Sequence, residues 1–411
     1  MKILQINSCH YRRGGADVVY LNTGKLFEDH GHEVYYFSQK SKKNIYTTTS
    51  KYFIKETNYF EKSFLGKFFL IPRFFFSLEA KKKISQLLND LQPDVAHVHL
   101  YKADLTPSIL QILKKNKVPV LITLHDYGML CPHNLMLDGK MNICNRCVHG
   151  SALNCIIHKC NRNNLIFSCL SSFEYIFQKK FFPFEKYFNK IIAVSKFGQK
   201  LHNESGIFRR KVDHLYNFYP NLVNTEINSK KGTYFLFFGR LSGEKGIETL
   251  FSAWLRKVRN SILKVVGTGE LFDVLNKMAS GNLGIEILGF KSGSELNILI
   301  REASFIIVPS ECYENNPLTI IEAYANGKPV IGSKIGGVPE IIDEGNTGYL
   351  FEMKSVRELS EKIDLAEAVD ENEYARLSNN ARKFAERHFN PMTHYDRLIE
   401  IYQQAIINKN Q

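Results

Sequence analysis

The chain has 411 residues, 44% of them hydrophobic, and a formal net charge of +13 at pH 7. This length allows two globular domains with separate cores, and the apolar content excludes a disordered chain. Neither a cleavable signal nor a segment apolar enough to span a membrane is recognisable in the sequence, so we expect a cytoplasmic protein.

The positive charge belongs to the first half of the chain. Residues 1–215 contain 32 Lys and Arg against 16 Asp and Glu, whereas residues 216–411 contain 22 against 25. Basic residues alternate with aromatic ones in residues 51–83 and again in residues 173–190. This composition suits a peripheral contact with an anionic membrane surface on the inner membrane face, and it equally suits a helical core with solvated lysines. Nucleic acid is not a predicted partner, because no nucleic-acid-binding motif accompanies the charge.

Strands and helices alternate along the first half, as expected for a parallel, doubly wound α/β sheet. Gly14 and Gly15 open a helix that we expect to end near His30. Residues 64–78 are the most membrane-like piece, but Lys67 and Arg73 interrupt it. The predicted strands of this half are residues 2–6, 33–37, 94–99, 120–124 and 190–194.

A polar triplet follows one of these strands. His125 comes directly after residues 120–124 and is followed by Asp126 and Tyr127. Because α/β sheets bind ligands at the carboxyl edge of their strands, His125 is a candidate active-site residue. A lone histidine at a strand end is more often structural, and the residues around this one favour the functional interpretation. His99 is a weaker candidate at the end of its own strand, and Ser195 is expected to cap the next helix rather than to bind ligand.

Six of the eight cysteines fall between residues 131 and 169. In a cytosolic protein, clustered cysteines favour a metal site or free thiols over disulfides. The spacing of Cys144, Cys147, Cys155 and Cys160 resembles that of structural zinc ligands. A structural zinc site and free buried thiols are both open interpretations. Alternative ligands are His133, His149 and His158.

The second half repeats the alternation of strands and helices from about residue 216 to residue 389. An apolar strand at residues 235–238 precedes Gly239, Arg240 and Lys245, on a loop that enters a helix. Two cations on such a loop can neutralise a diphosphate and assist its departure without a metal. For a single Arg–Lys pair considered alone, a salt-bridged surface loop is the alternative interpretation. Gly267 follows the next apolar strand, which is a weak signal alone.

Residues 309–342 hold the most informative pattern. A buried strand at residues 305–308 ends at Pro309, and Asn316 and Pro317 then predict the cap and first position of a helix over residues 317–326. The free amides and positive dipole end of this helix suit a diphosphate. Glu314 before the helix and Glu322 in its second turn can accept hydrogen bonds from sugar hydroxyls, although each alone would more often be solvated.

Together these segments resemble the donor-binding region of glycosyltransferase family 4, also described as glycosyl transferases group 1. The family pattern has two glutamates separated by seven residues, then Ala, a Gly-x-Pro turn and Gly-Gly-x-x-Glu. Many members have Gly-Phe-Gly-Leu after the first glutamate, whereas this chain has Asn-Asn-Pro-Leu, in which Pro317 has no N–H to offer. The matching positions are Glu314, Glu322, Ala323, Gly327, Pro329, Gly336, Gly337 and Glu340.

The resemblance implies roles for individual residues. His125 would lie near the donor sugar, and Glu314 would contact that sugar. Gly15 would lie on the acceptor-side loop that approaches the donor. Arg240 and Lys245 would stabilise the departing diphosphate, and Glu322 would bind the ribose hydroxyls. The remaining donor-binding positions would be Gly239, Gly267 and the backbone amides of Asn316 and Leu318.

The resemblance also implies an architecture and an activity. The fold would be GT-B, with two Rossmann-like domains facing a cleft: residues 1–215 on the acceptor side, residues 216–389 for the nucleotide sugar, and residues 390–411 as a helix crossing back. The activity would be retaining, metal-independent transfer of a hexose from a nucleoside-diphosphate sugar to a glycan or lipid-linked acceptor, in capsule, lipopolysaccharide or related polysaccharide biosynthesis. No cofactor would be required for catalysis. A sugar-nucleotide epimerase of the same architecture and a catalytically silent scaffold partner remain alternatives.

Overall fold

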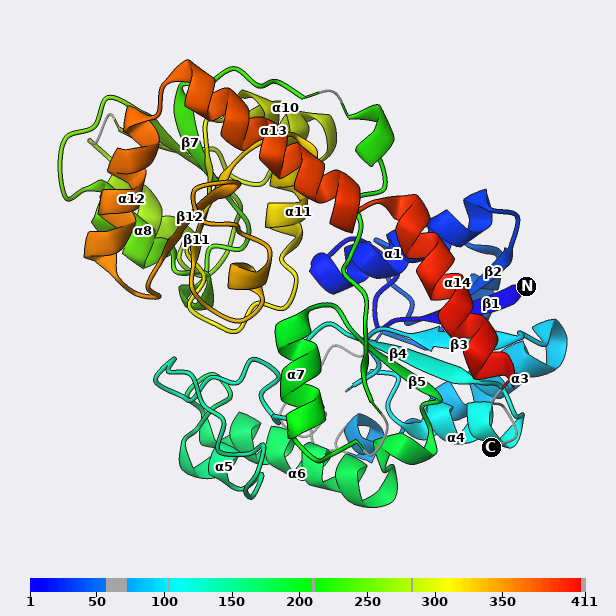
Figure 1. The fold of residues 1–411 in the computed structure, drawn as a ribbon. Helices are drawn as coiled ribbons and strands as arrows, with labels where there is room; N and C mark the ends of the chain where they lie inside the picture. The colour runs from blue at the N-terminus through cyan, green and yellow to red at the C-terminus, as the bar shows by residue number, and fades with distance from the viewer. Residues whose placement is uncertain (57–71, 103, 209–210, 226, 282–283, 408–411) are drawn as a thin grey trace. The chain divides into compact units, whose positions relative to one another are not determined.

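The computed structural model describes residues 1–56, 72–102, 104–208, 211–225, 227–281 and 284–407. The chain divides into two compact units, one formed by Met1–Leu215 with Met392–Gln411 and the other by Tyr216–Pro391. Each unit contains its own six-stranded sheet (Figure 1). The first eight residues of the membrane-like piece at 64–78 lie outside the described residues.

The sheet of the first unit has the order β2-β1-β3-β4-β5-β6, and all its strand pairs are parallel. The strand order reverses between β1 and β3, so ligands are expected at the carboxyl ends of these two strands. The strands are β1 (Lys2–Ile6), β2 (Glu33–Phe37), β3 (Val95–Val98), β4 (Val120–Leu124), β5 (Lys190–Ala193) and β6 (Asp213–His214).

The sheet of the second unit has the order β12-β11-β10-β7-β8-β9, again with parallel pairs throughout. Its chain order reverses between β7 and β10, as in the dinucleotide-binding fold. The strands are β7 (Tyr234–Phe238), β8 (Ile262–Val266), β9 (Ile285–Ile287), β10 (Ile306–Val308), β11 (Val330–Ser333) and β12 (Gly348–Phe351).

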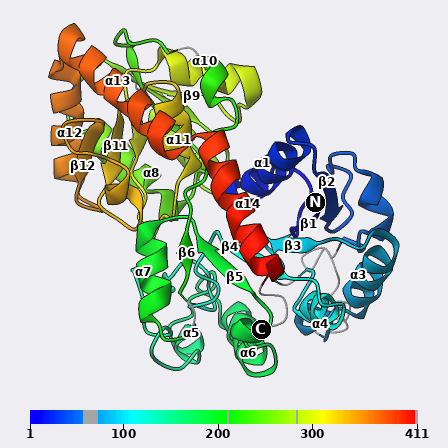
Figure 2. The ribbon, with the colours of Figure 1, turned by 45° about the vertical axis from the view of Figure 1, so that its right-hand side comes forward.

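Helices connect the strands in both units (Figures 1 and 2). Among the described residues, each helix is too short or too polar to cross a bilayer. The helices of the first unit are α1 (Gly15–Asp29), α3 (Leu78–Leu91), α4 (Ser108–Lys115), α5 (Asn154–Ile157), α6 (Leu165–Phe181), α7 (Lys196–Glu204) and α14 (Pro391–Ile407). Those of the second are α8 (Ile247–Trp254), α9 (Phe272–Ala279), α10 (Gly293–Glu302), α11 (Leu318–Ala325), α12 (Val356–Ala368) and α13 (Glu371–His388).

Strand β7 shows why the second sheet needs helices on both faces. Its alternate residues Phe235 and Phe237 join a core cluster with α8 and α12, whereas Leu236 and Phe238 join another with α11 and α13. Each such side chain contributes roughly 1.5–3 kcal/mol when fully buried, so neither face can be left in water. The prediction of two doubly wound parallel sheets is confirmed.

The last helix, α14, covers the sheet of the first unit. Leu398, Ile401 and Tyr402 are buried against Ile3 of β1 and Phe27 of α1. The rings of Phe27 and Tyr402 stack with centroids 5.0 Å apart. The helix predicted within residues 390–411 therefore contributes to the core of the first unit.

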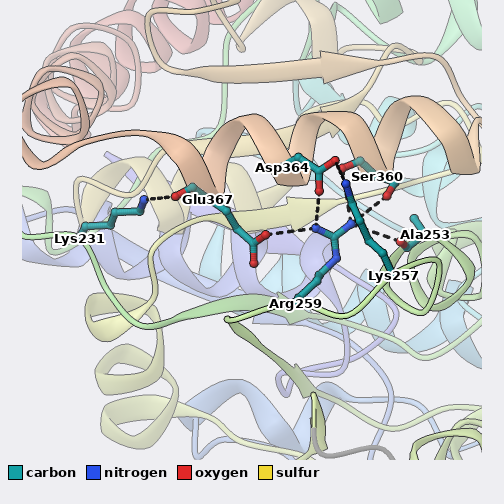
Figure 3. Close-up of polar contacts among 7 residues, drawn as sticks. All are labelled: Lys231, Ala253, Lys257, Arg259, Ser360, Asp364 and Glu367. Atoms are coloured by element: carbon teal, nitrogen blue, oxygen red, sulfur yellow. Dashed lines mark hydrogen bonds and ion pairs between the residues drawn. The ribbon is translucent and has the colours of Figure 1, made fainter.

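A charged network fastens α12 to the segment after α8 (Figure 3). The Arg259 side chain, only 2% exposed, donates to Asp364 at 2.7 Å, to Glu367 at 3.3 Å and to the Ser360 hydroxyl at 2.8 Å. Lys257 binds the other carboxylate oxygen of Asp364. A buried guanidinium needs such paired acceptors, so this network stabilises the second unit.

Candidate functional site

The switch point of the second sheet brings together two loops that the sequence predicts to bind a sugar nucleotide. β7 ends at Phe238 and leads into Gly239 and Arg240, and β10 ends at Val308 and leads toward Glu314. β7 and β10 are neighbouring parallel strands. Both loops therefore leave the sheet at its carboxyl edge, side by side, where open α/β sheets bind ligands.

An ion pair joins these two loops. The Lys245 ammonium donates to Oε1 of Glu314 at 2.6 Å, and the Ser310 hydroxyl donates to the same oxygen at 2.7 Å. The Lys245 side chain is 32% exposed and that of Glu314 is 13% exposed. One cation and one carboxylate are thus held at the switch point while keeping partial access to solvent.

Electrostatics keep both members of this pair ionised. Burial alone would lower the pKa of Lys245 and raise that of Glu314, because it disfavours both charges. The opposite charge and the hydrogen bond of the partner outweigh burial, so the pKa of Lys245 is raised and the pKa of Glu314 is lowered. Burial raises the pKa of nearby Cys312 to about 12, which keeps its thiol protonated. Lys245 therefore stays a cation that an anionic ligand can approach.

Two glycines allow the loops to lie this close. Gly246, with φ +66°, follows Lys245, and a Cβ there would lie 1.9 Å from the carbonyl oxygen of Pro309. Gly336, with φ +57°, packs against the backbone of Glu314, where a Cβ would lie 2.3 Å from its carbonyl oxygen. The Gly337 N–H donates to that carbonyl at 2.7 Å. Gly336 and Gly337 thus hold the Glu314 backbone, and Gly246 lets the Lys245 loop approach Pro309.

The helix after Glu314 differs from the prediction at its start. α11 begins at Leu318 because Pro317 is extended, with φ −64° and ψ 121°, and stands at the cap position. The predicted cap by Asn316 is wrong. Its side-chain oxygen instead accepts a hydrogen bond from the N–H of Asn217 at 2.8 Å. Leu318 is the first helical residue, so its amide is one of those left without an intrahelical partner.

Glu322 lies in the second turn of α11 and is partly buried. Burial, and next the charge of Glu322, raise the pKa of Tyr219, so the tyrosine hydroxyl lies in the field of this carboxylate. Tyr219 is a polar neighbour of the candidate ribose-binding residue that no motif in the sequence indicated.

The loops after β7 and β8 are also paired. The Gly239 N–H donates to Val266 at 3.0 Å, and a Cβ on Gly267, whose φ is +144°, would lie 1.8 Å from the carbonyl oxygen of Gly239. Arg240 extends from this pairing with a side chain that is 65% exposed, 3.9 Å from the Glu244 carboxylate. A surface ion pair this long holds Arg240 weakly and leaves its guanidinium available.

In the first unit, the partly buried His125 forms one end of a hydrogen-bonded chain whose other members are buried. Its Nε2 lies 2.9 Å from Nδ1 of His99, and the two rings stack with centroids 5.1 Å apart. Nε2 of His99 contacts Oε1 of Gln5 at 3.0 Å, and the Gln5 amide donates to the Tyr402 hydroxyl at 3.3 Å. The Tyr402 hydroxyl also contacts Nδ1 of His97 at 2.7 Å. The chain ends at the Thr123 hydroxyl, which contacts Nε2 of His97 at 2.7 Å.

The donors and acceptors of this chain assign the histidine tautomers. Burial lowers the pKa of His99 well below its usual value, so His99 is neutral, and the Gln5 oxygen can only accept. His99 must therefore carry its proton on Nε2, which makes its Nδ1 an acceptor for Nε2–H of His125. Burial also lowers the pKa of His125, to about 3, so this ring is neutral with its lone pair on Nδ1.

The other predicted residues of the first unit lie at helix starts. Gly15 is the first residue of α1, whose cap residue Gly14 donates its N–H to Asp17 at 3.1 Å. Asp17 also accepts from Asn7, directly after β1, at 2.8 Å. Ser195 accepts from the Gly198 N–H at 2.9 Å and caps α7, as predicted.

Three of the four candidate zinc ligands, Cys147, Cys155 and Cys160, form one buried cluster. Cys144 is buried as well, and every cysteine is in the free form. A hydrogen bond from Cys155 to Cys160 lowers the pKa of the Cys160 thiol. Within the part of the chain that the structure describes, no three His, Cys, Asp or Glu side chains are arranged to hold a metal. The zinc site stays a prediction.

Comparison with known proteins places the chain in a family. The model of the Glycosyltransferase Family 4 domain matches residues 13–220, and that of glycosyl transferases group 1 matches residues 222–384. The chain belongs to glycosyltransferase family 4. The Arg240, Lys245, Glu314 and Glu322 positions of this family 4 chain all fall within the group 1 match.

Individual relatives agree with this assignment. An uncharacterized glycosyltransferase of Methanocaldococcus jannaschii is 33% identical over 204 residues, 48% of this chain and 55% of the relative. The lipopolysaccharide 1,2-N-acetylglucosaminetransferase of Salmonella typhimurium is 34% identical over 134 residues, 29% of this chain and 35% of that enzyme. The family 4 chain thus spans about half or less of these curated relatives.

Solved structures show the fold over the whole length. HepE of Anabaena, in complex with UDP-glucose, superposes with a TM-score of 0.67 at 18% identity, covering 98% of this chain and 99% of HepE. The fold of the family 4 chain is therefore GT-B, with two Rossmann-like domains.

Proposed function

We propose that this protein transfers a hexose from a nucleoside-diphosphate sugar to a hydroxyl of a glycan or lipid-linked acceptor, with retention of the anomeric configuration. The observation that carries the proposal is the Lys245–Glu314 pair at the switch point of the second sheet. In this pair, a cation that can bind a diphosphate lies next to a carboxylate that can accept hydrogen bonds from sugar hydroxyls. Family membership and the UDP-glucose complex of HepE support this choice of donor.

In the reaction, the bond between the anomeric carbon and the β-phosphate oxygen breaks as the acceptor oxygen bonds to the anomeric carbon. The acceptor proton passes to an oxygen of the departing diphosphate, which leaves as the nucleoside diphosphate. Lys245 and Arg240 would stabilise the negative charge that grows on this leaving group, together with the amides at the start of α11. Glu314 would orient the sugar, and Glu322 the ribose. Retention follows from the family resemblance and assigns no glutamate as a nucleophile.

The proposed chemistry requires no metal ion. The chain contains no Asp-x-Asp sequence, the usual carboxylate pair that holds a metal on a sugar nucleotide. Two cations and a helix start offer the same charge stabilisation from protein groups. Activity in the presence of a chelator is therefore expected to equal activity without it.

The proposed setting is cell-surface polysaccharide biosynthesis at the inner face of a membrane. The Salmonella relative acts, by its name, on lipopolysaccharide, and a relative in Escherichia coli is named for colanic acid biosynthesis. A lipid-linked or polysaccharide acceptor is consistent with both names.

Product analysis tests the proposed function. The protein is incubated with a panel of nucleoside-diphosphate hexoses and a lipid extract, with and without chelator, and products are identified by mass spectrometry and by the anomeric proton coupling in NMR. An acceptor that gains one hexose with the donor's configuration is the expected result. An isomerised donor without transfer would instead make the protein an epimerase, and strict dependence on a divalent ion would remove the metal-free mechanism.

A further inference from the structure

Helix α6 of the first unit has mainly polar residues on its buried side and large apolar residues on its exposed side. Its buried side is largely polar: Ser172 donates to the Ala152 carbonyl at 2.9 Å, and the Tyr175 hydroxyl donates to the Met129 carbonyl at 3.0 Å. Gln178, also buried, binds Glu174 one turn earlier. The helix therefore attaches to its unit through hydrogen bonds as well as through apolar packing.

The opposite side of α6 presents large apolar residues to solvent. Ile166, Phe173 and Ile176 are exposed and recur at intervals of seven and three residues, which places them along one stripe of the helix. Leu165 and Phe181 are exposed at its two ends. The neighbouring α5 contacts α6 (Figures 1 and 2). Its last residue, Ile157, is exposed. An exposed apolar stripe of this length marks an interaction surface.

The charges around this stripe all have one sign. Lys159 and Arg162 precede the helix and Lys179 and Lys180 lie in its last turn, and all four are exposed. The single carboxylate of residues 139–181, Glu174, is only 5% exposed and bonds to Gln178. Apolar side chains between cations, without exposed acids, match the interface of an anionic lipid bilayer, whose headgroups attract the cations while its acyl region takes up the apolar groups.

We propose that the exposed face of α6 docks on an anionic membrane surface, with Ile166, Phe173 and Ile176 entering the interface. The helix would lie in the plane of the interface, since its cations stand at both ends rather than at one. A second copy of this chain suits the surface less well. In a two-fold contact the same patch meets itself, which would bring the cations of both copies together.

Vesicle flotation at low salt tests this surface. The full-length protein is mixed with vesicles of phosphatidylcholine alone, or of phosphatidylcholine and phosphatidylglycerol in equal parts. We expect binding to the anionic vesicles only. The double variant Ile166→Ser/Phe173→Ser should lower the partition coefficient about tenfold or more. Lys179→Glu/Lys180→Glu should lower it at least about 25-fold, because loss of two cations at an anionic surface alone gives that factor and the two glutamates add repulsion.

Matched variants in the second unit distinguish binding through α6 from non-specific attraction of a basic protein to anionic vesicles. Val258→Ser/Phe290→Ser removes two exposed apolar residues, and Arg256→Glu/Lys277→Glu reverses two exposed cations. Both should bind vesicles as the unchanged protein does. Circular dichroism and the melting temperature verify that each variant is folded.

Several results would overturn the proposal. These are failure of the unchanged protein to float, flotation of the α6 variants equal to that of the unchanged protein, and a loss of binding by the control variants as large as that of the α6 variants. Loss of a dimer in sedimentation velocity by the α6 variants, without change in flotation, would assign the face to a second copy. Flotation uses no sugar donor, so its outcome is independent of the proposed transferase activity.

Discussion

Lys245 and Glu314 lie 69 residues apart in the sequence, yet Nζ of one is 2.6 Å from Oε1 of the other. They are joined because β7 and β10 are adjacent at the point where the strand order of the second sheet reverses. The pair forms a preorganised charged site, since both groups are ionised before any ligand arrives.

Removal of either charge should slow transfer strongly. In Lys245→Ala the leaving diphosphate loses one stabilising cation, and we expect kcat to fall about 100- to 1,000-fold, the effect of deleting one preorganised donor elsewhere. Glu314→Gln should act mainly through the sugar, with a comparable loss. Steady-state kinetics with the preferred donor measure both. Lys264→Ala, which removes a lysine of β8 paired with Glu286, is the matched control and should retain activity.

The Arg259 network should be important for stability rather than for transfer. Arg259→Met removes hydrogen bonds to Asp364, Glu367 and Ser360, and we expect a loss of about 3–5 kcal/mol in unfolding free energy, the usual cost of removing one partner of a buried ion pair. Urea denaturation measures it. Arg357→Met, which removes a surface pair with Glu361, should change stability by less than about 0.5 kcal/mol. Equal losses in the two variants would contradict the network's role.

Buried histidine makes stability depend on pH. Burial lowers the pKa of His97 to about 3, against about 6.5 in an unfolded chain. Between these values the unfolded state binds a proton that the folded state does not, so stability falls as pH decreases below about 6.5. The slope from this one residue reaches about 1.4 kcal/mol per pH unit. Urea denaturation at several pH values should give a shallower slope for His97→Gln. An unchanged slope would show that His97 is protonated in the folded protein.

The chain from Tyr402 to His125 should fix a tautomer. Because the Gln5 side-chain oxygen accepts from His99, His125 carries its proton on Nε2, and ¹⁵N NMR of labelled histidine should show a protonated Nε2 and an unprotonated Nδ1. Gln5→Leu removes that acceptor and should mix the two tautomers. Ser195→Ala, a helix cap elsewhere in the same unit, should leave the spectrum of His125 unchanged. The opposite tautomer in the unchanged protein would contradict the assignment.

The cysteine cluster offers a test of the zinc prediction. If Cys144, Cys147, Cys155 and Cys160 bind zinc, purified protein should contain one zinc per chain by mass spectrometry, and chelation should lower the melting temperature. Metal-free protein with thiols that react only after denaturation would establish free buried cysteines instead. The raised pKa of Cys147, to about 12 and caused mainly by burial, fits slow thiol reaction in the folded state without zinc.

Local patterns in the sequence predicted five of the strands in the first sheet, whereas the two-residue strand β6 was not predicted. Strands β1, β2 and β4 have the predicted bounds, and β4, which is apolar apart from Thr123, is buried along its whole length, as expected for a central strand of a parallel sheet. The start of α11 was missed by one residue. Asn316 is an excellent cap in isolation, but its side chain is held by Asn217, a tertiary contact that no local pattern indicates.

The residues of the candidate site could be predicted from the sequence, but the contacts between them could not. The two motifs predicted that Lys245 and Glu314 contact the same ligand. Their ion pair with each other depends on the order of the strands in the sheet. Ser310 directly follows the strand-ending Pro309, and a hydroxyl at that place was an available signal. Gln5 and Tyr402 lie almost 400 residues apart, so their link to His125 could not be predicted from spacing.

Binding of the diphosphate at Lys245 is tested most directly by calorimetry. UDP and other nucleoside diphosphates are titrated into the unchanged protein, Lys245→Ala and the control Lys264→Ala. We expect one nucleotide to bind at a single site, Lys245→Ala to weaken its binding about tenfold to a hundredfold, and Lys264→Ala to leave the Kd unchanged. Equal affinity of all three proteins would contradict the placement of the diphosphate at Lys245.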